Sequence, residues 1–151
     1  MANNSIDCYV VPAKPLPLLI PLECVAEVVK KPDLQQLSQA PAKWMQGYLT
    51  WENQRVPVLS YSALHDSSLD ESKKRNAQVV VLNPIPDAAR KAFSGLLCFG
   101  AVKTLPIDTQ SAYGELPDGV DRRYVEAVVK LGEEEYLVPK LAALGVAFSY
   151  F

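Results

Sequence analysis

The stretch GYLTWENQRVPVLSY, residues 47–61, is the clearest structural signal in the chain. Two runs of apolar, aromatic and β-branched residues flank a short polar segment, which is typical of an antiparallel β-hairpin. The strands are predicted over residues 48–51 and 55–59, with the turn at 52–54. Gly47 precedes the first strand and predicts a positive φ or a close backbone approach, since glycine has no Cβ.

Two segments before the hairpin also predict strands, over residues 6–11 and 16–22. The second carries leucine or isoleucine at even positions and prolines at positions 17 and 21. Because a proline cannot donate to a sheet ladder, this segment predicts an edge strand. Residues 23–31 are open to two interpretations, a short helix or a strand, because their valines suit either structure.

The sequence after the hairpin repeats the same style. Strands are predicted over residues 78–82, 95–105, 124–131 and 134–138. The segments between them predict an exposed loop over 65–76, a connection over 84–93, a turn-rich loop over 106–123, and a helical turn or two over 139–144 that stops at Gly145. Short strands with little helix predict barrels or a sandwich. The residues predicted to be buried are Val56, Val58, Val80, Leu96 and Val128.

Length and charge restrict the function. A chain of 151 residues suits one domain, or two small subdomains with a shared core. Its net charge of −2 leaves no electrostatic footprint for nucleic acid. We find no secretory leader and no apolar run near the ~20 residues of a membrane helix, so we expect a cytoplasmic protein without direct membrane insertion. The three cysteines are widely spaced and predict free thiols.

No catalytic, metal-binding or cofactor-binding constellation stands out in the sequence. The single histidine, His65, lies at the edge of a polar loop, where a solvated ring is expected. A zinc site needs three or four His, Cys or carboxylate ligands, and the dispersed cysteines do not suit one. We therefore expect no enzyme activity, no metal and no cofactor. Binding is the function class that is left by elimination.

Three motifs in order carry a resemblance to a known family. They are Val25-Ala26-Glu27-Val28, PAKWMQG at residues 41–47, and Val56-Pro57-Val58-Leu59. In this order and spacing they resemble the CheW-like domain family of chemotaxis coupling proteins. Residues 78–82, 95–102 and 124–144 resemble the later strands, closing hairpin and short helix of that family. The resemblance covers essentially the whole chain.

The resemblance implies one all-β domain over residues 1–151: two intertwined five-stranded β-barrels of the SH3 or OB kind share a hydrophobic core, with short helices and a loop near 65–76 between halves. It implies a non-catalytic signalling adaptor between the cytoplasmic tip of a chemoreceptor and the regulatory domain of a chemotaxis-type histidine kinase. The kinase would bind mainly the first barrel, and the receptor would bind near the groove between barrels. The protein-binding residues implied by position are Val25, Glu27, Val28, Gly47, Tyr48, Leu49, Trp51, Glu52, Gly95, Leu96 and Leu97.

The chain departs from the family pattern in three places. Thr50-Trp51-Glu52-Asn53 replaces a hairpin turn that is commonly Asn-x-Arg-Gly, so an acid replaces a base. Phe99 replaces a strand-end aspartate, and Pro139-Lys140-Leu141 replaces Leu-Asp-Leu. Such a divergent member is similar to those of accessory chemosensory systems, such as the systems governing type IV pili. The alternative function is a peptide- or small-ligand-binding β-barrel outside chemotaxis, because a fold does not determine function.

Overall fold

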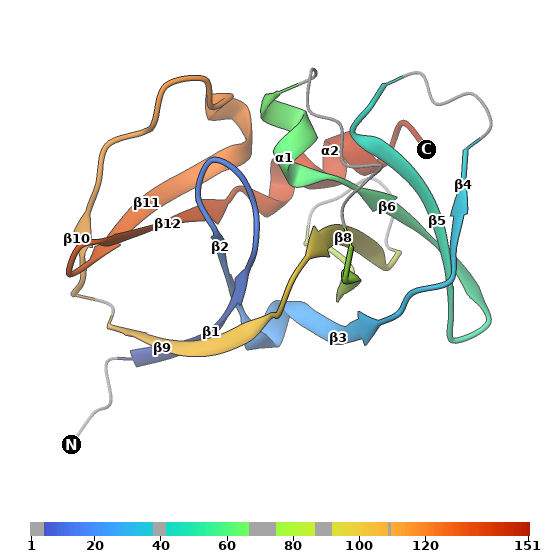
Figure 1. Ribbon diagram of the computed structural model, residues 1–151, viewed down its shortest axis with the longest axis horizontal. Helices are drawn as coiled ribbons and strands as arrows, with labels where there is room; N and C mark the ends of the chain where they lie inside the picture. Colours follow the sequence, from blue (N-terminus) through green and yellow to red (C-terminus); the bar gives the residue numbers. More distant parts are fainter. Residues whose placement is uncertain (1–4, 38–41, 67–74, 87–91, 109) are drawn as a thin grey trace.

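Two six-stranded sheets lie side by side in the computed structural model, which describes residues 5–37, 42–66, 75–86, 92–108 and 110–151 (Figure 1). The terminal sheet, on the left of Figure 1, has the strand order β10 (Ala112–Tyr113), β11 (Val125–Leu131), β12 (Glu134–Pro139), β2 (Leu18–Pro21), β1 (Ser5–Val11) and β9 (Lys103–Asp108). The central sheet has the order β3 (Val25–Lys30), β7 (Ala77–Leu82), β8 (Ser94–Phe99), β6 (Gln54–Leu59), β5 (Met45–Trp51) and β4 (Leu34–Gln36). The all-β prediction is confirmed, with six strands per sheet where five were expected.

Strands from the first and the last parts of the chain come together in the terminal sheet. The N-terminal strand β1 pairs with β2 and β9, and β2 also lies parallel to β12 near the C-terminus. All strands of the central sheet come from between these segments, over residues 25–99. Strands β7 and β8 follow the polar segment at 65–76, of which residues 67–74 lie outside the described chain, and they still belong to the central sheet.

The prediction that residues 16–22 form an edge strand is wrong. Strand β2 lies inside the terminal sheet, between β1 and β12. The prolines do not prevent this because a proline still offers its carbonyl: the N–H of Leu137 donates to the oxygen of Pro17 at 2.9 Å. Leu18, Leu19 and Ile20 are buried, so both faces of β2 are covered. A proline forbids donation at its own nitrogen only, and here the bond from β12 needs an acceptor.

Two further strand predictions are resolved by pairing across the chain. Of the alternatives for residues 23–31, the strand is confirmed, since a single 3-10 turn, η1 (Leu22–Cys24), leads into β3. The single strand predicted over 95–105 is wrong, because β8 ends at Phe99 and β9 begins at Lys103 in the other sheet. Gly100 between them has a φ of 112°, which redirects the chain. The predicted loop over 106–123 contains the end of β9, all of β10 and part of η2 (Arg122–Tyr124).

Two short α-helices lie between the sheets in the upper middle of Figure 1. Helix α1 (Tyr61–His65) was not predicted; it begins where the Ser60 side chain accepts a hydrogen bond from the Ala63 N–H. Helix α2 (Leu141–Phe148) continues through Gly145, so the predicted stop there is wrong. Burial of the last turn, which ends in Phe148, outweighs a glycine cost of about 1 kcal/mol. Within the described residues, no helix is long and apolar enough to cross a membrane.

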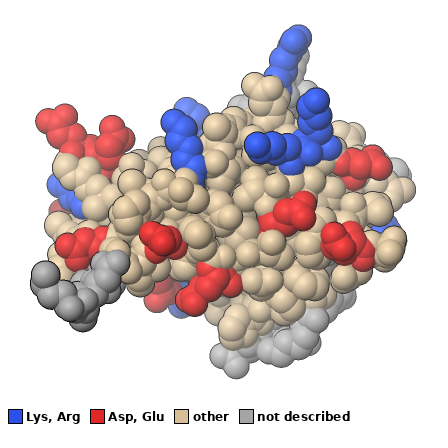
Figure 2. Space-filling model, turned by 90° about the horizontal axis from the view of Figure 1, so that it is seen from below, with Lys and Arg blue, Asp and Glu red and all other residues tan. Residues whose placement is uncertain are grey.

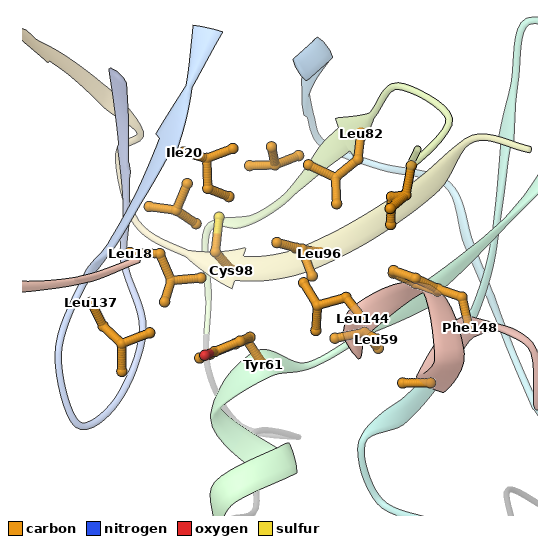
Figure 3. Close-up of a cluster of buried hydrophobic side chains, with 14 residues drawn as sticks. Leu18, Ile20, Leu59, Tyr61, Leu82, Leu96, Cys98, Leu137, Leu144 and Phe148 are labelled. Atoms are coloured by element: carbon orange, nitrogen blue, oxygen red, sulfur yellow. The ribbon is translucent and has the colours of Figure 1, made fainter. Parts of the chain in front are cut away.

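A shared hydrophobic core joins the two sheets, as expected. Figure 3 shows side chains from both sheets and from α2 in one cluster, among them Leu18, Ile20, Leu137, Leu59, Leu82, Leu96, Cys98, Leu144 and Phe148. All five valines and leucines predicted to be buried are at most 5% exposed, which confirms that prediction. The cysteines are free: Cys8 and Cys98 are buried and Cys24 is half-buried.

Candidate protein-interaction surface

The β5–β6 hairpin carries five of the candidate residues: Gly47, Tyr48, Leu49, Trp51 and Glu52. Its turn consists of Glu52 and Asn53, with φ values of 49° and 59°. Two consecutive positive φ values match the right-handed twist of the flanking strands, which keeps the hairpin tight. The Glu52 side chain is exposed at the tip. The predicted hairpin is confirmed, and its tip presents a carboxylate.

Three half-buried aromatic rings and one exposed arginine contact one another around β5, and two of the rings, Trp44 and Phe151, also pack against the shared core. The Arg55 guanidinium lies 4.1 Å from the centroid of the Tyr48 ring, and the Phe151 ring meets Tyr48 edge-on at 5.8 Å. Trp44 meets the same Phe151 ring at 6.1 Å. We call Trp44, Tyr48, Arg55 and Phe151 the aromatic ridge. Tyrosine, tryptophan and arginine are the residue types that dominate binding energy at protein interfaces.

Gly47 and Gly95 shape this surface without contacting a partner through a side chain. Gly47 has a φ of 143°, and a Cβ there would lie 2.2 Å from the backbone oxygen of Gln35 in β4. The predicted positive φ and close approach are both confirmed. A Cβ on Gly95 would lie 2.7 Å from Cγ1 of Val79, so the absence of a side chain lets β8 pack against its neighbour.

Leu49 and Leu96 are each 1% exposed and belong to the two main hydrophobic clusters. In this fold they offer no surface to a partner. Trp51 is half-buried against Phe93, with ring centroids 4.9 Å apart, and Leu97 is half-buried in the same cluster of the central sheet. Buried candidates of this kind support the strands that carry the exposed residues.

Strand β3 carries the other candidates at an edge of the central sheet. Val25 and Val28 are half-buried against the shared core, while Glu27 is exposed. The register with β7 shifts between Val25 and Glu27, which marks a β-bulge. In strand order, β7, β8 and β6 separate β3 from β5, so Glu27 and Glu52 are not neighbours on paired strands. Figure 2 shows acidic side chains spread over the face seen from below, where β1, β3 and β9 lie, and basic side chains gathered toward one rim.

The prediction that His65 is a solvated loop residue is wrong. His65 ends α1 and is half-buried, and its Nδ1 accepts a hydrogen bond from the Asp121 N–H at 3.0 Å. Its ring lies 4.6 Å from the Tyr61 ring, centroid to centroid. Burial lowers the pKa of His65, and the Asp121 carboxylate offsets this only in part. Sequence reasoning missed this cluster because its members lie 56 residues apart.

No cluster of three or more His, Cys, Asp or Glu side chains able to hold a metal ion occurs among the described residues. The interior of the central sheet is filled by side chains: Leu49, Val56, Val58, Val79 and Val81 pack there. What the structure offers for binding is its outer surface. Two packed six-stranded sheets that share one hydrophobic core define a β-rich, two-sheet domain.

Comparison with known proteins assigns the family. A family model, the CheW-like domain, matches residues 9–145, and the chain belongs to this family. The fold is similar to the crystal structure of the scaffolding protein TtCheW from Thermoanaerobacter tengcongensis, with a TM-score of 0.71 and 17% sequence identity over 90% of this chain and 89% of that chain. No curated protein matches the sequence. The similarity to members in type IV pilus systems stays a prediction.

Proposed function

We propose that this protein is a non-catalytic, cytoplasmic signalling adaptor that links the cytoplasmic tip of a chemoreceptor to the regulatory domain of a chemotaxis-type histidine kinase. Membership of the CheW-like family supports this role. The observation that carries it is the aromatic ridge, because it gathers tyrosine, tryptophan and arginine, residue types enriched at protein interfaces, beside the tightly turned β5–β6 hairpin. The alternative, a barrel that encloses a small ligand, is not favoured, because the interior of the central sheet is packed.

In this proposal the kinase domain binds the central-sheet side, over the ridge, the Glu52 tip and the exposed edge of β3. Arg55 stacks on Tyr48, so its guanidinium is held flat while its donors stay accessible for a carboxylate of the partner. Glu27 and Glu52 add two exposed acids, which favour basic residues in the partner's surface. The receptor tip binds near the groove between the sheets, where Leu97, Pro12 and Ser62 line a hollow of about 120 Å³.

Binding of the purified partners tests the proposal. Titration calorimetry with the regulatory domain of the kinase should detect a complex, and Arg55→Ala should weaken it by about fivefold or more, as expected for an interface arginine whose loss costs more than ~1 kcal/mol. The matched control is Arg122→Ala, which removes an exposed arginine on the terminal-sheet side. Failure of the wild-type protein to bind kinase or receptor would contradict the adaptor role. Equal losses for Arg55→Ala and Arg122→Ala would contradict the position of the surface.

A further inference from the structure

Helix α1 connects the two sheets through three side chains. The Tyr61 hydroxyl donates to the backbone oxygen of Tyr124 at 2.5 Å, and the Ser62 Oγ accepts from the Lys14 N–H at 2.9 Å. His65 completes the set through its bond from the Asp121 N–H. Helix α1 directly follows β6 of the central sheet, whereas each of the three partner groups adjoins strands of the terminal sheet.

The His65 bond differs from the other two because it depends on a lone pair. An imidazole nitrogen accepts a hydrogen bond only when it carries no proton, so the ring in this position is neutral and has its proton on Nε2. Protonation would place an N–H on Nδ1, facing the N–H of Asp121, and the bond would be lost. The hydroxyls of Tyr61 and Ser62 keep their hydrogen-bonding roles through the same pH range.

The surroundings of the ring disfavour its charged form. Nε2 is buried and has no hydrogen-bond partner among the described residues. The rings of Tyr61 and Tyr124 lie against the imidazole, with centroids 4.6 and 6.2 Å away. The Asp121 carboxylate would attract an imidazolium, but it already binds the Arg123 guanidinium at 2.7 Å. The charged groups that face the ring across the adjoining hollow are Lys14, Asp66 and Asp118. Their two carboxylates against one ammonium act in the opposite sense, so burial is the cause that lowers the pKa of His65.

The hollow beside α1 is the space into which the protonated His65 ring can rotate. It has a volume of about 480 Å³, adjoins α1 and is lined by His65, Lys14, Pro15, Ser62, Asp66, Asp118 and Gly119. A side-chain rotation toward it would exchange the Asp121 bond for solvent. From this geometry we propose that His65 is a pH-sensitive latch: the neutral ring holds α1 to η2 and thereby the central sheet to the terminal sheet, and protonation of the ring releases this contact.

The direction of the pH effect follows from the two states of the ring. Burial lowers the pKa of His65 in the folded protein, while in the unfolded chain it has its ordinary value of about 6.5. The unfolded chain therefore binds more protons between these two values. The stabilisation by His65 is complete above about pH 6.5 and is lost as the pH falls toward the folded pKa. Between the folded and the unfolded pKa of His65, each decrease of one pH unit lowers the folding equilibrium constant by up to about tenfold.

Nuclear magnetic resonance on the full chain tests the latch directly, since His65 is the single histidine. The ring should titrate below pH 6.5, its neutral form should carry the proton on Nε2, and the Asp121 amide resonance should shift with the same midpoint. A ring pKa at or above 6.5, a proton on Nδ1 in the neutral form, or an Asp121 amide that ignores the titration would overturn the proposal. These measurements need no variant.

A second experiment uses His65→Asn, because the asparagine oxygen replaces Nδ1 as an acceptor and does not ionise. Urea unfolding of both proteins is measured between pH 5 and pH 8. As the pH falls below about 6.5, the folding equilibrium constant of the wild type should decrease relative to that of His65→Asn. Above about pH 6.5 the ratio of the two constants should not change. A ratio that is the same at every pH would overturn the latch. Carboxylates away from the ring affect both proteins alike and cancel in the ratio. The Asp121 carboxylate, whose pKa the Arg123 hydrogen bond holds below its ordinary value, stays charged throughout this pH range.

Discussion

Gly47 occupies a backbone conformation that side chains rarely adopt. Its φ of 143° lies outside even the left-handed helical region, and the oxygen of Gln35 occupies the place of a Cβ. Two separate costs therefore act against any substitution: backbone strain and a clash with the neighbouring strand β4. The position of Gly47 directly before a strand was sufficient to predict a positive φ or a close backbone approach, and the structure has both.

The substitution Gly47→Ala should lower the free energy of unfolding by more than the ~1–3 kcal/mol of backbone strain alone. The control is Gly132→Ala in the β11–β12 turn, where φ is 64° and nothing lies within 4 Å of an added Cβ. That change should cost about 1–2 kcal/mol, the cost of the left-handed region. Urea denaturation of both variants separates strain from clash. Equal losses in the free energy of unfolding for the two variants would show that the Gln35 backbone shifts at little cost to accept the added Cβ.

Glu52 is the clearest residue-scale departure from the family, and its exposure at a turn predicts little effect on folding. The substitution Glu52→Arg should change the free energy of unfolding by no more than about 0.5 kcal/mol. If the turn lies at the rim of the kinase interface, the same change should alter the association rate and its dependence on salt. The comparison is Glu133→Arg, at the exposed tip of the other hairpin. Stopped-flow measurements at two ionic strengths give the association rate of each variant. A rate that Glu52→Arg leaves unchanged at both ionic strengths would place Glu52 outside the interface.

At the scale of elements, α1 is small and important. It has five residues, too few for a stable helix on propensity alone, so it depends on its cap and its contacts. The Ser60 side chain accepts from the Ala63 N–H at 3.2 Å, and the Ser60 N–H donates to the Trp44 oxygen. The sequence contains this cap, but a five-residue helix leaves too short a periodic pattern to predict.

The substitution Ser60→Ala should destabilise the protein by about 1 kcal/mol, because it removes the N-cap of α1. Ser149→Ala, in an exposed position at the end of α2, should stay within about 0.5 kcal/mol of the wild type. Thermal unfolding monitored by circular dichroism measures both. Equal midpoints for the two variants would mean that the cap does not support α1.

At the scale of the whole molecule, the shared core makes the two sheets interdependent. Leu18 of β2 and Leu96 of β8 lie in the same cluster although they belong to different sheets (Figure 3). Neither sheet can separate without exposing this cluster. We therefore expect the domain to unfold in a single cooperative transition.

The substitution Leu18→Ala should lower the free energy of unfolding by about 2–5 kcal/mol, the usual cost of a cavity at a fully buried leucine. Trp51 packs in the central-sheet cluster and Trp44 against the shared core, so fluorescence reports on these two places, whereas circular dichroism reports on both sheets. The two signals should shift together in Leu18→Ala, although Leu18 belongs to the terminal sheet. Separate transitions would contradict the shared core. Val146→Ala, exposed on α2, is the surface control.

The elements that could be predicted from the amino-acid sequence are those whose signal is local. Alternation and turn chemistry placed the hairpins near residues 47–61 and 124–138, and ordered motifs carried the family resemblance. These features predicted the all-β class and the central position of the β5–β6 hairpin in the candidate surface. Strand alternation is a property of neighbouring residues, so it can be interpreted without knowing what the strand pairs with.

The sheet that each strand joins and the surroundings of each side chain depend on contacts between distant parts of the chain. The chain bends at Gly100, so that β9 joins the terminal sheet. Strand β2, which follows two prolines, pairs with β12 and therefore lies in the interior of the terminal sheet. Leu49 and Leu96, candidate contacts by position, are core residues, and His65 is held by Asp121 from across the molecule. Burial and hydrogen-bond partners depend on residues far apart in the chain. Local pattern therefore predicted the strands, while long-range packing determined the surface and the environment of His65.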